Sequence, residues 1–470
     1  MTDLAALKPL IDIVGPANAL TEPADTAPYL REWRDLYQGR TPAVLRPGST
    51  QEVAAILREA NRLGLRIVPQ GGNTGLVGGQ IPDETATEIV LSLARLNKVR
   101  TVDAEGYTMT VEAGCVLEKI HEAAEAADRL FPLTLGSQGS CQIGGNLSTN
   151  AGGTAVLAYG NSRDLVLGLE VVLPTGEIWN GLRSLRKDNT GYDLKQLFIG
   201  AEGTLGVITA AVLKLFPRPR AQEVAFAGLN DPESALALFT RARAKAGPML
   251  TGFELMPRVG IEFCLSHLHG ARDPLTAAHP WYVLIELSSG TEGAGLRELM
   301  EEILGDAFEA GLVEDAALAE SGAQAAAFWH LRHGMSEVQR EEGGSIKHDV
   351  SVPVASVPAF LKQAIAAVEA MVPGCRPVPF GHMGDGNIHF NVSQPVGADK
   401  AAYLARWDEM NELVHGIVHE FNGSVSAEHG IGRLKRHLLT EVKSDIELDM
   451  MRRIKTAFDP NGVLNPGRVV

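Results

Sequence analysis

The sequence predicts an α+β protein built from two or three domains. The chain has 470 residues, which is more than one compact core usually holds. Many of its 50 glycines gather in clusters between strand-like segments, and these clusters stop near residues 217–220. Beyond that point, strand-like and amphipathic helical segments alternate, which is typical of a sheet covered by helices.

The first predicted elements are a helix over residues 49–63 and a strand over residues 65–69. Ser49 and Glu52 have the spacing of a capping box at the start of the helix, and Gly64 ends it. The strand leads into a glycine-rich segment at residues 71–79. Because no helix pattern follows it, we interpret this segment as a nest of backbone N–H groups for phosphate rather than a Rossmann loop.

Two more glycine-rich segments follow, at residues 136–153 and 199–208. Strands are predicted around them, at residues 107–113, 165–173, 177–179 and 211–216. Loops of this kind, gathered in one region, indicate a long phosphorylated ligand. We expect an α+β domain here rather than a doubly wound sheet.

The second half of the chain carries the alternating elements. We predict strands at residues 281–287, 345–352, 377–380 and 387–392, and helices at 294–304, 324–341, 357–372 and 400–421. A short strand and a tight turn follow residue 422, and residues 458–467 are rich in turn-forming residues. The predicted domains are residues 1–220, 221–420 and 421–470.

Composition excludes several classes of function. A net charge of −15 argues against nucleic-acid binding, and an anionic substrate would need a local group of Arg or Lys side chains. The four cysteines lie far apart, which fits neither a zinc motif nor a disulfide framework. The N-terminus lacks the pattern of a signal peptide, and no apolar run reaches the roughly 18 residues of a membrane helix. We therefore expect a cytoplasmic protein without a transmembrane segment.

Chemistry is concentrated in residues 379–392. If Asp385 and Gly386 form a two-residue hairpin turn, His382 lies opposite His389 and the two imidazoles share one face. Opposed residues have Cβ atoms roughly 4.5–5.5 Å apart, from which two ring nitrogens can reach one metal ion. A polar hairpin with surface histidines is the alternative, and a register shift of one residue would separate the rings.

Glu428 and His429 form a second polar pair, ahead of a glycine turn. Neighbours on an extended chain point to opposite sides, so one can bind a metal while the other faces a substrate. With His382 and His389, Glu428 would complete a set that suits zinc, manganese or cobalt. A surface Glu-His dipeptide is the alternative.

A group of cations is predicted near residues 332–347. Arg332 and Ser336 lie four apart on one face of the predicted helix, and Lys347 shares one side of its strand with Asp349 and Ser351. Arg332 offers a planar fork and Lys347 a point charge, and together they could bind a carboxylate. A solvated surface is the competing interpretation.

With these residues in place, the chain resembles the flavin-binding superfamily of vanillyl-alcohol oxidase and p-cresol methylhydroxylase type. Within it, the chain is similar to the D-2-hydroxyglutarate dehydrogenase and D-lactate dehydrogenase branch. The resemblance covers nearly the whole chain. It rests on the motifs Pro69-Gln-Gly-Gly-Asn-Thr-Gly75, Gly136-Ser-Gln-Gly-Ser-Cys-Gln-Ile-Gly-Gly145, Glu202-Gly-Thr-Leu-Gly-Val-Ile208, Gly381-His-Met-Gly-Asp-Gly-Asn-Ile-His389, Ala427-Glu-His-Gly-Ile-Gly432 and Asp459-Pro-Asn-Gly-Val-Leu-Asn-Pro-Gly467.

The resemblance implies an FAD-binding domain of two subdomains, an inserted α/β (ferredoxin-like) substrate cap domain, and a C-terminal segment that returns to the flavin domain. It implies FAD contacts in all the glycine-rich segments and in the tail. These residues are Pro69, Gly71, Gly72, Asn73, Thr74, Gly75, Gly136, Ser137, Gly139, Ser140, Gly144, Asn146, Asn150, Gly152, Gly153, Gly203, Gly206, Val207, Ile208 and Asn465. Only Cys141, in the second segment, could bond FAD covalently, and we expect non-covalent FAD.

The same resemblance assigns roles to the polar clusters. His382, His389 and Glu428 match the family's metal ligands, with zinc as the expected ion, and His429 matches its catalytic base. The matching substrate contacts are Arg332, Lys347 and Asn391, and also Ser336, which stands where a threonine is usual.

The implied reaction is oxidation of a D-2-hydroxy acid to a 2-oxo acid by hydride transfer to FAD. Two cations favour a dicarboxylate, D-2-hydroxyglutarate or D-malate, with D-lactate or glycolate as the alternative. An ether-lipid alkyl transferase is a more remote alternative, since that branch carries a run of histidines where this chain has Ala427, Glu428 and His429. A flavin-independent metallohydrolase is a further alternative.

The partners expected from the sequence are a small anionic 2-hydroxy acid and a separate electron acceptor. No NAD fingerprint or iron–sulfur cysteine set is visible, so we expect an electron-transfer flavoprotein or a quinone as acceptor. The protein could also assemble as a homodimer.

Overall fold

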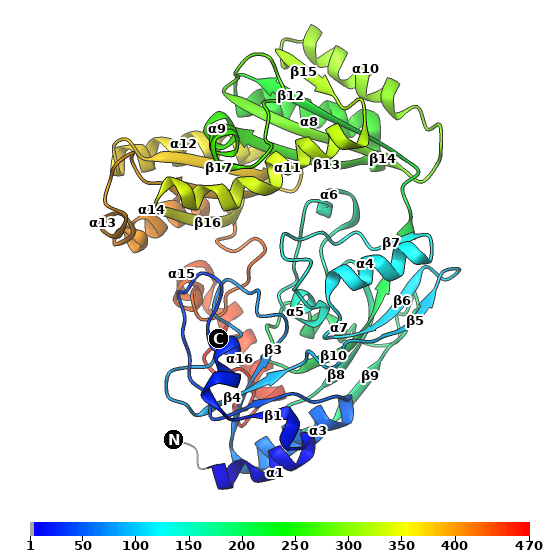
Figure 1. Ribbon diagram of the computed structural model, residues 1–470, viewed down its shortest axis with the longest axis vertical. Helices are drawn as coiled ribbons and strands as arrows, with labels where there is room; N and C mark the ends of the chain where they lie inside the picture. The colour runs from blue at the N-terminus through cyan, green and yellow to red at the C-terminus, as the bar shows by residue number, and fades with distance from the viewer. Residues whose placement is uncertain (1–3) are drawn as a thin grey trace. The chain divides into compact units, whose positions relative to one another are not determined.

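The computed structural model describes residues 4–470 and divides into two compact units (Figure 1). The first unit holds the N-terminal segment through Gly153, together with Gly160–Arg218 and Glu428–Val470. The second unit holds Thr154–Tyr159 and Pro219–Ala427. The inclusion of residues 154–159 in the second unit was not expected from the sequence. The α+β class is confirmed.

The first unit contains two main sheets. In the four-stranded sheet, of order β1-β2-β4-β3, β2 and β3 run parallel to β4 and β1 is antiparallel to β2. Its strands are β1 Ala19–Leu20, β2 Val44–Leu45, β4 Glu88–Ser92 and β3 Arg66–Gln70. The five-stranded sheet is fully antiparallel, with the order β5 Val99–Asp103, β6 Thr108–Glu112, β10 Val207–Lys214, β8 Val166–Val172 and β9 Ile178–Gly181.

Helix α3, Thr50–Leu63, begins and ends at the residues that the sequence predicts. The Ser49 hydroxyl accepts the Glu52 N–H at 3.2 Å, and Gly64 ends the helix in the left-handed region at a φ of 67°. The Glu52 carboxylate accepts the N–H of Gly48 rather than that of Ser49, so only half of the predicted capping box forms. The buried side of the helix carries Val53 and Ile56, both fully buried.

The C-terminal tail returns to the four-stranded sheet, as predicted. After helix α16, Asp445–Phe458, Leu464 forms a parallel bridge with Ile67 of β3. Arg468 then forms an ion pair with Glu88 of β4, and both side chains are 2% exposed. Breaking such a buried pair usually costs several kcal/mol, so the pair anchors the tail to the sheet.

The second unit is organised around one seven-stranded antiparallel sheet, of order β15-β12-β14-β13-β17-β18-β16. Strands β12 to β15 have the βαββαβ order of a ferredoxin-like sheet with one additional helix, α9, between β13 and β14, and the remaining strands extend the sheet beyond β13. The strands are β12 Ala221–Leu229, β13 Leu250–Pro257, β14 Trp281–Ser289, β15 Asp315–Leu318, β16 Ser345–Ser351, β17 Arg376–His382 and β18 Asn387–Ser393.

Helices cover both faces of this sheet (Figure 1). One face carries four helices that pack side by side in the order α10, α8, α12, α14. They are α10 Leu296–Glu309, α8 Pro232–Ala246, α12 Val357–Met371 and α14 Trp407–Glu420. The other face carries α9 Arg258–His267 and α11 Gly322–Val338, which contact each other and form a core with β17 and β12. Short helix α6, Val156–Tyr159, contacts β13.

Several expectations about local structure are wrong. The helix predicted over residues 400–421 is broken by a turn at residues 405–406 into α13, Lys400–Leu404, and α14. Beside the break, the Tyr403 hydroxyl donates to Val392 O at 2.7 Å and the Arg406 guanidinium to Met371 O at 3.1 Å. In residues 422–432 a single bridge, from Ser424 to Ser351, replaces the predicted strand. Strands β12, β13 and β15 and helices α8 and α9 were not predicted at all.

Helix α12 is the apolar helix of the second unit. By length and composition alone, the 18 residues Val354–Met371, with mean hydropathy 1.3, would suffice to cross a membrane. In the structure α12 packs against α8, α14 and β17, and Phe360 and Leu361 are fully buried. These contacts bury one side of α12 against the sheet and the neighbouring helices.

Candidate active site

The hairpin of β17 and β18 brings the two predicted histidines together, although not in the predicted register. His382 lies opposite Asn387, and His389 lies opposite Phe380. The His382 carbonyl accepts the N–H groups of both Asp385, at 3.2 Å, and Gly386, at 3.1 Å, so the loop has four residues instead of two. Since side chains alternate with a period of two, a shift of two residues keeps both histidines on one face.

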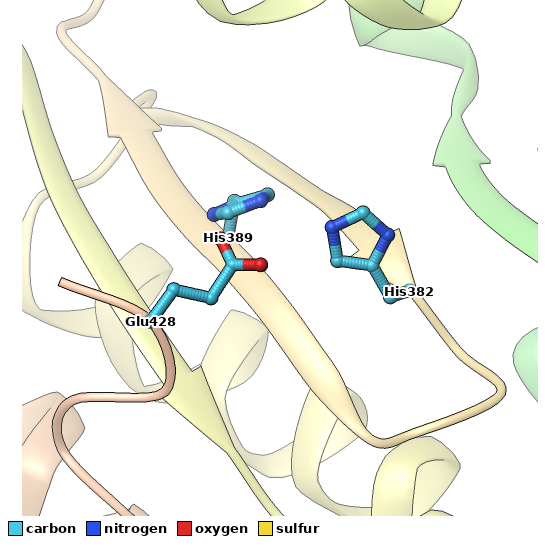
Figure 2. Close-up of side chains that lie close together, drawn as sticks. All are labelled: His382, His389 and Glu428. Atoms are coloured by element: carbon cyan, nitrogen blue, oxygen red, sulfur yellow. The ribbon is translucent and has the colours of Figure 1, made fainter. Parts of the chain in front are cut away.

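Three side chains of types that can bind a metal lie close together at this hairpin (Figure 2). The ring centroids of His382 and His389 are 5.7 Å apart. The chain leaves the second unit at Ala427, whose N–H donates to Asp349 O, and Glu428 is the next residue. Ligand atoms of His382, His389 and Glu428 all lie within 4.8 Å of one another. Two imidazoles and a carboxylate are a donor set that fits zinc, and His429 forms a similar group with Asp349 and Glu428.

Each histidine is accompanied by a buried carboxylate. Glu254 of β13, 1% exposed, accepts the Nδ1–H of His382 at 2.7 Å through Oε1. Asp349 of β16, 3% exposed, lies opposite His389, with 4.0 Å between Oδ1 and Nδ1. Such carboxylates commonly orient metal-binding histidines. Burial alone would raise the pKa of Glu254, but His382 and Arg332 outweigh it and lower that pKa to about 2.

The predicted cations also gather on this face. The Nε–H of Arg332 donates to Glu254 Oε2 at 2.6 Å, and its guanidinium lies 4.9 Å from the centre of the Phe380 ring. Lys347 Nζ donates at 2.9 Å to the backbone carbonyl of Ser336, one turn along α11 from Arg332. Lys347 pairs with Asn391 of β18.

Some of these polar groups have no protein partner. Arg332 is 6% exposed, but its Nη1 and Nη2 make no hydrogen bond within the described residues 4–470. Asn391 is 3% exposed, and no hydrogen bond of its side-chain amide to the described residues is present. Donors of a largely buried side chain that lack a protein partner are available to a polar ligand.

The glycine-rich segments and the tail converge within the first unit. Gly200 N–H donates to Leu147 O at 3.0 Å and Glu202 N–H to Ser148 O at 2.8 Å, which joins the third segment to the second. A Cβ on Gly203 would meet Pro69 at 3.3 Å, beside the first segment. The Asn465 side chain donates to Glu202 O at 2.7 Å and so joins the tail to the same place.

These segments fit a large ligand that approaches the backbone closely. A Cβ on Gly72 would lie 2.1 Å from Ser140 O, so only glycine allows the first and second segments to meet. Gln142 Oε1, next to Gly71, and Asn465 Oδ1 are buried and accept no hydrogen bond from the described part of the chain. Unpaired acceptors of this kind, beside glycine-rich backbone, suit a dinucleotide.

Other predicted cofactor residues have structural tasks. The Asn73 amide donates to Arg31 O at 2.9 Å, Asn150 Oδ1 accepts Arg163 N–H at 2.9 Å, and the Asn146 amide contacts Cys141 Sγ at 3.5 Å. Val207 and Ile208 were expected in a loop but lie in β10, paired with β8. The remaining predicted residues lie in or beside the converging segments: Thr74, Gly75, Gly136, Ser137, Gly139, Gly144, Gly152, Gly153 and Gly206.

Glu202 connects the third segment to the turn that follows His429. Its carboxylate accepts the N–H groups of Ile431 at 2.7 Å and Gly432 at 2.8 Å. Burial raises the pKa of Glu202 in spite of these bonds. A Cβ on Gly430 would lie 2.7 Å from Glu202 Oε1, so the turn requires glycine there.

Sequence reasoning missed Glu254, Gln142 and Glu202. Gln142 and Glu202 stand inside the glycine-rich motifs, so the motifs themselves could have indicated them. Glu254 stands in an apolar strand that was not predicted, and its isolated charge in that run was the available signal.

Comparison with known proteins identifies the family. Residues 41–181 match the FAD binding domain family, and residues 218–469 match the family of FAD linked oxidases, C-terminal domain. The chain belongs to the FAD-linked oxidase family. The chain is an FAD-dependent dehydrogenase, as predicted.

Several curated relatives carry D-2-hydroxyglutarate in their names. D-2-hydroxyglutarate dehydrogenase of Xanthomonas citri pv. viticola is 39% identical over 96% of this chain and 93% of the relative. The mitochondrial enzyme of the same name from Rattus norvegicus is 38% identical over 99% of this chain and 84% of the relative. A D-2-hydroxyglutarate–pyruvate transhydrogenase of Saccharomyces cerevisiae is 38% identical over 95% of this chain and 90% of the relative.

Solved structures share the fold. p-Cresol methylhydroxylase with substrate bound aligns with a TM-score of 0.78, at 16% identity, over 99% of this chain and 96% of that chain. An alkyldihydroxyacetonephosphate synthase aligns with a TM-score of 0.76, at 17% identity, over 99% and 85%. The predicted fold is confirmed.

Replacing Gly72 by alanine tests the contact between the first two glycine-rich segments. Relieving the overlap with Ser140 O should cost about 1–3 kcal/mol, which weakens FAD binding roughly 5- to 150-fold. The measurement is the Kd of FAD for the apoprotein, with Gly305→Ala as control, because a Cβ at Gly305 on α10 meets no atom within 4 Å. Unchanged affinity in Gly72→Ala would contradict a cofactor role for this contact.

Proposed function

We propose that this dehydrogenase oxidises D-2-hydroxyglutarate to 2-oxoglutarate. The observation that carries the proposal is the buried guanidinium of Arg332, which has unpaired donors on the same sheet face as a cluster of metal ligands. In a protein of net charge −15, a buried cation with free donors indicates a specific anionic partner. The names of the curated relatives agree with this substrate.

The proposed metal ligands are His382, His389 and Glu428, and the proposed ion is zinc. The fit rests on the donor types and on their mutual distances within 4.8 Å. A divalent ion bound there would supply Lewis-acid chemistry, lowering the pKa of the substrate's α-hydroxyl. The histidines must be neutral to serve as ligands, and the carboxylates beside them favour the required tautomers.

The proposed roles of the other residues follow from their chemistry. His429 is the base that takes the hydroxyl proton, and it stands next to Glu428 in the chain. Arg332 and Lys347, with Ser336, bind the distal carboxylate, Arg332 through a planar fork and Lys347 through a point charge. Asn391 offers its unpaired amide to the substrate.

We further infer that FAD is bound non-covalently by the residues of the converging glycine-rich segments and by Asn465. Bound FAD supplies the hydride acceptor. The first segment contains neither His nor Cys, and Cys141 in the second is 1% exposed and contacted by Asn146. A buried thiol of this kind is a structural residue rather than a flavin linkage.

Acid precipitation of the purified protein tests the mode of attachment. We expect the flavin to stay in the supernatant and the protein pellet to be colourless, because denaturation releases a cofactor held by hydrogen bonds alone. A yellow pellet whose flavin resists extraction would contradict the inference, and the Cys141→Ala variant would then identify the linked atom.

The remaining expectations stay proposals. We propose that a separate protein or molecule, either an electron-transfer flavoprotein or a quinone, accepts the electrons. A cytoplasmic location, a homodimeric assembly and the domain limits 1–220, 221–420 and 421–470 are the other proposals. The eukaryotic relatives from rat and Arabidopsis thaliana carry "mitochondrial" in their names, so location differs among relatives.

Anaerobic reduction of the flavin by a panel of 2-hydroxy acids tests the substrate. The panel contains D- and L-2-hydroxyglutarate, D-malate, D-lactate and glycolate. Hydrogen bonds between charged groups contribute about 1.5–3 kcal/mol, so kcat/KM for D-2-hydroxyglutarate should exceed that for D-lactate roughly 10- to 150-fold. Faster bleaching by D-lactate at low concentration would contradict the dicarboxylate assignment, and no bleaching by any member would contradict the reaction.

The His429→Asn variant tests the proposed base. Loss of general-base catalysis should lower kcat roughly 10²- to 10⁴-fold while flavin content is unchanged. His437→Asn is the control, because His437 is an exposed histidine of the same C-terminal segment. Retention of kcat in His429→Asn would show that another group accepts the proton.

A further inference from the structure

One buried carboxylate joins the proposed metal site to the proposed carboxylate site. Glu254, in the middle of β13, is 1% exposed. Its Oε1 accepts the Nδ1–H of His382 at 2.7 Å, and its Oε2 accepts the Nε–H of Arg332 at 2.6 Å. Within the described residues these are its hydrogen-bond partners, so the two oxygens serve two different sites.

The contact with His382 determines which ring nitrogen carries the proton. An ionised carboxylate can only accept hydrogen bonds, so Nδ1 of His382 must carry the proton. The neutral ring then presents the lone pair of Nε2, the form that a metal ion requires. The backbone pairing of Glu254 with His382 across β13 and β17 holds the two side chains at this distance.

The contact with Arg332 determines how the guanidinium is held. Nε is occupied by Glu254, and the planar group lies 4.9 Å from the centre of the Phe380 ring. Nη1 and Nη2 remain without a partner among the residues described, which is the pair of donors that a substrate carboxylate needs. A long side chain fixed in this way loses less entropy when the ligand binds.

We propose that Glu254 is a positioning residue shared by both sites, which couples metal binding to recognition of the distal substrate carboxylate. This inference rests on the proposed function. Through Glu254, His382 and Arg332 form one hydrogen-bonded unit, so a change that displaces one partner alters the other. The coupling is a free energy between two sites and is therefore reciprocal.

The Glu254→Gln variant tests this role. A glutamine amide offers one accepting oxygen and one donating nitrogen, so it cannot accept from both partners. Loss of a residue that orients a metal ligand commonly lowers metal affinity 10- to 100-fold, and we expect a loss of this size. We also expect a higher KM for D-2-hydroxyglutarate. The readouts are zinc content after dialysis against a zinc buffer, and KM and kcat measured at saturating zinc.

Glu286→Gln is the matched control. Glu286 is a neighbouring acid on β14, on the same face of the sheet as Glu254, but it accepts hydrogen bonds from Thr251 and Trp329 and contacts neither His382 nor Arg332. Its zinc affinity and KM should equal those of the wild type. If Glu254→Gln is insoluble, Glu254→Asp replaces it, since the shorter acid keeps the charge but spans only one of the two contacts.

The outcomes separate this inference from the proposed function. A wild type that binds no divalent ion would overturn the metal site and the coupling together. If the wild type binds zinc and the Glu254 variant binds it equally well, or if only one of zinc affinity and KM changes, the shared role is overturned while the proposed function stands.

Discussion

The alternation of side chains across the seven-stranded sheet is the constraint on which the proposed site depends. Glu254, His382, His389 and Asp349 stand on four consecutive strands, β13, β17, β18 and β16, and all point to one face. They form a row in which two imidazoles lie between two carboxylates. If the register of any of these strands shifted by one residue, the side chain that this strand contributes would point to the opposite face of the sheet. The neighbouring imidazole or carboxylate would then lose its partner. The antiparallel pairing therefore fixes the chemistry of the site as well as the fold.

This constraint explains how much of the site the sequence could predict. The histidine pair was predicted from the hairpin, and it survives an incorrect register because the error was two residues rather than one. Glu254 could not be predicted in the same way, since its contact with His382 joins residues 128 apart and arises only when β13 pairs with β17. A local pattern shows which residues share an element. It does not show which distant element lies beside it.

In the first unit too, the local pattern of the glycine-rich segments does not indicate which distant residues lie beside them. Their clustering predicted a cofactor site, but only some of the glycines are required by close contacts: a Cβ would lie 2.1 Å from a carbonyl oxygen at Gly72 and 2.0 Å at Gly153. Asn73 and Asn150 instead hold the loops through their side chains. Glu202, which joins the third segment to the turn after His429, has partners 229 and 230 residues further along the chain, beyond the reach of any local motif.

Stability alone does not account for the buried charges of the second unit. Desolvating Glu254 and Arg332 costs free energy that their mutual attraction recovers only in part, and apolar side chains of similar size at such positions are often as stable or more so. The Phe380 ring and the surrounding core would accommodate such a replacement. What an apolar pair could not provide is a fixed tautomer at His382 and a guanidinium held by one nitrogen with two left free. The placement of an acid in the apolar strand β13 is therefore explained by the orientation of its two partners.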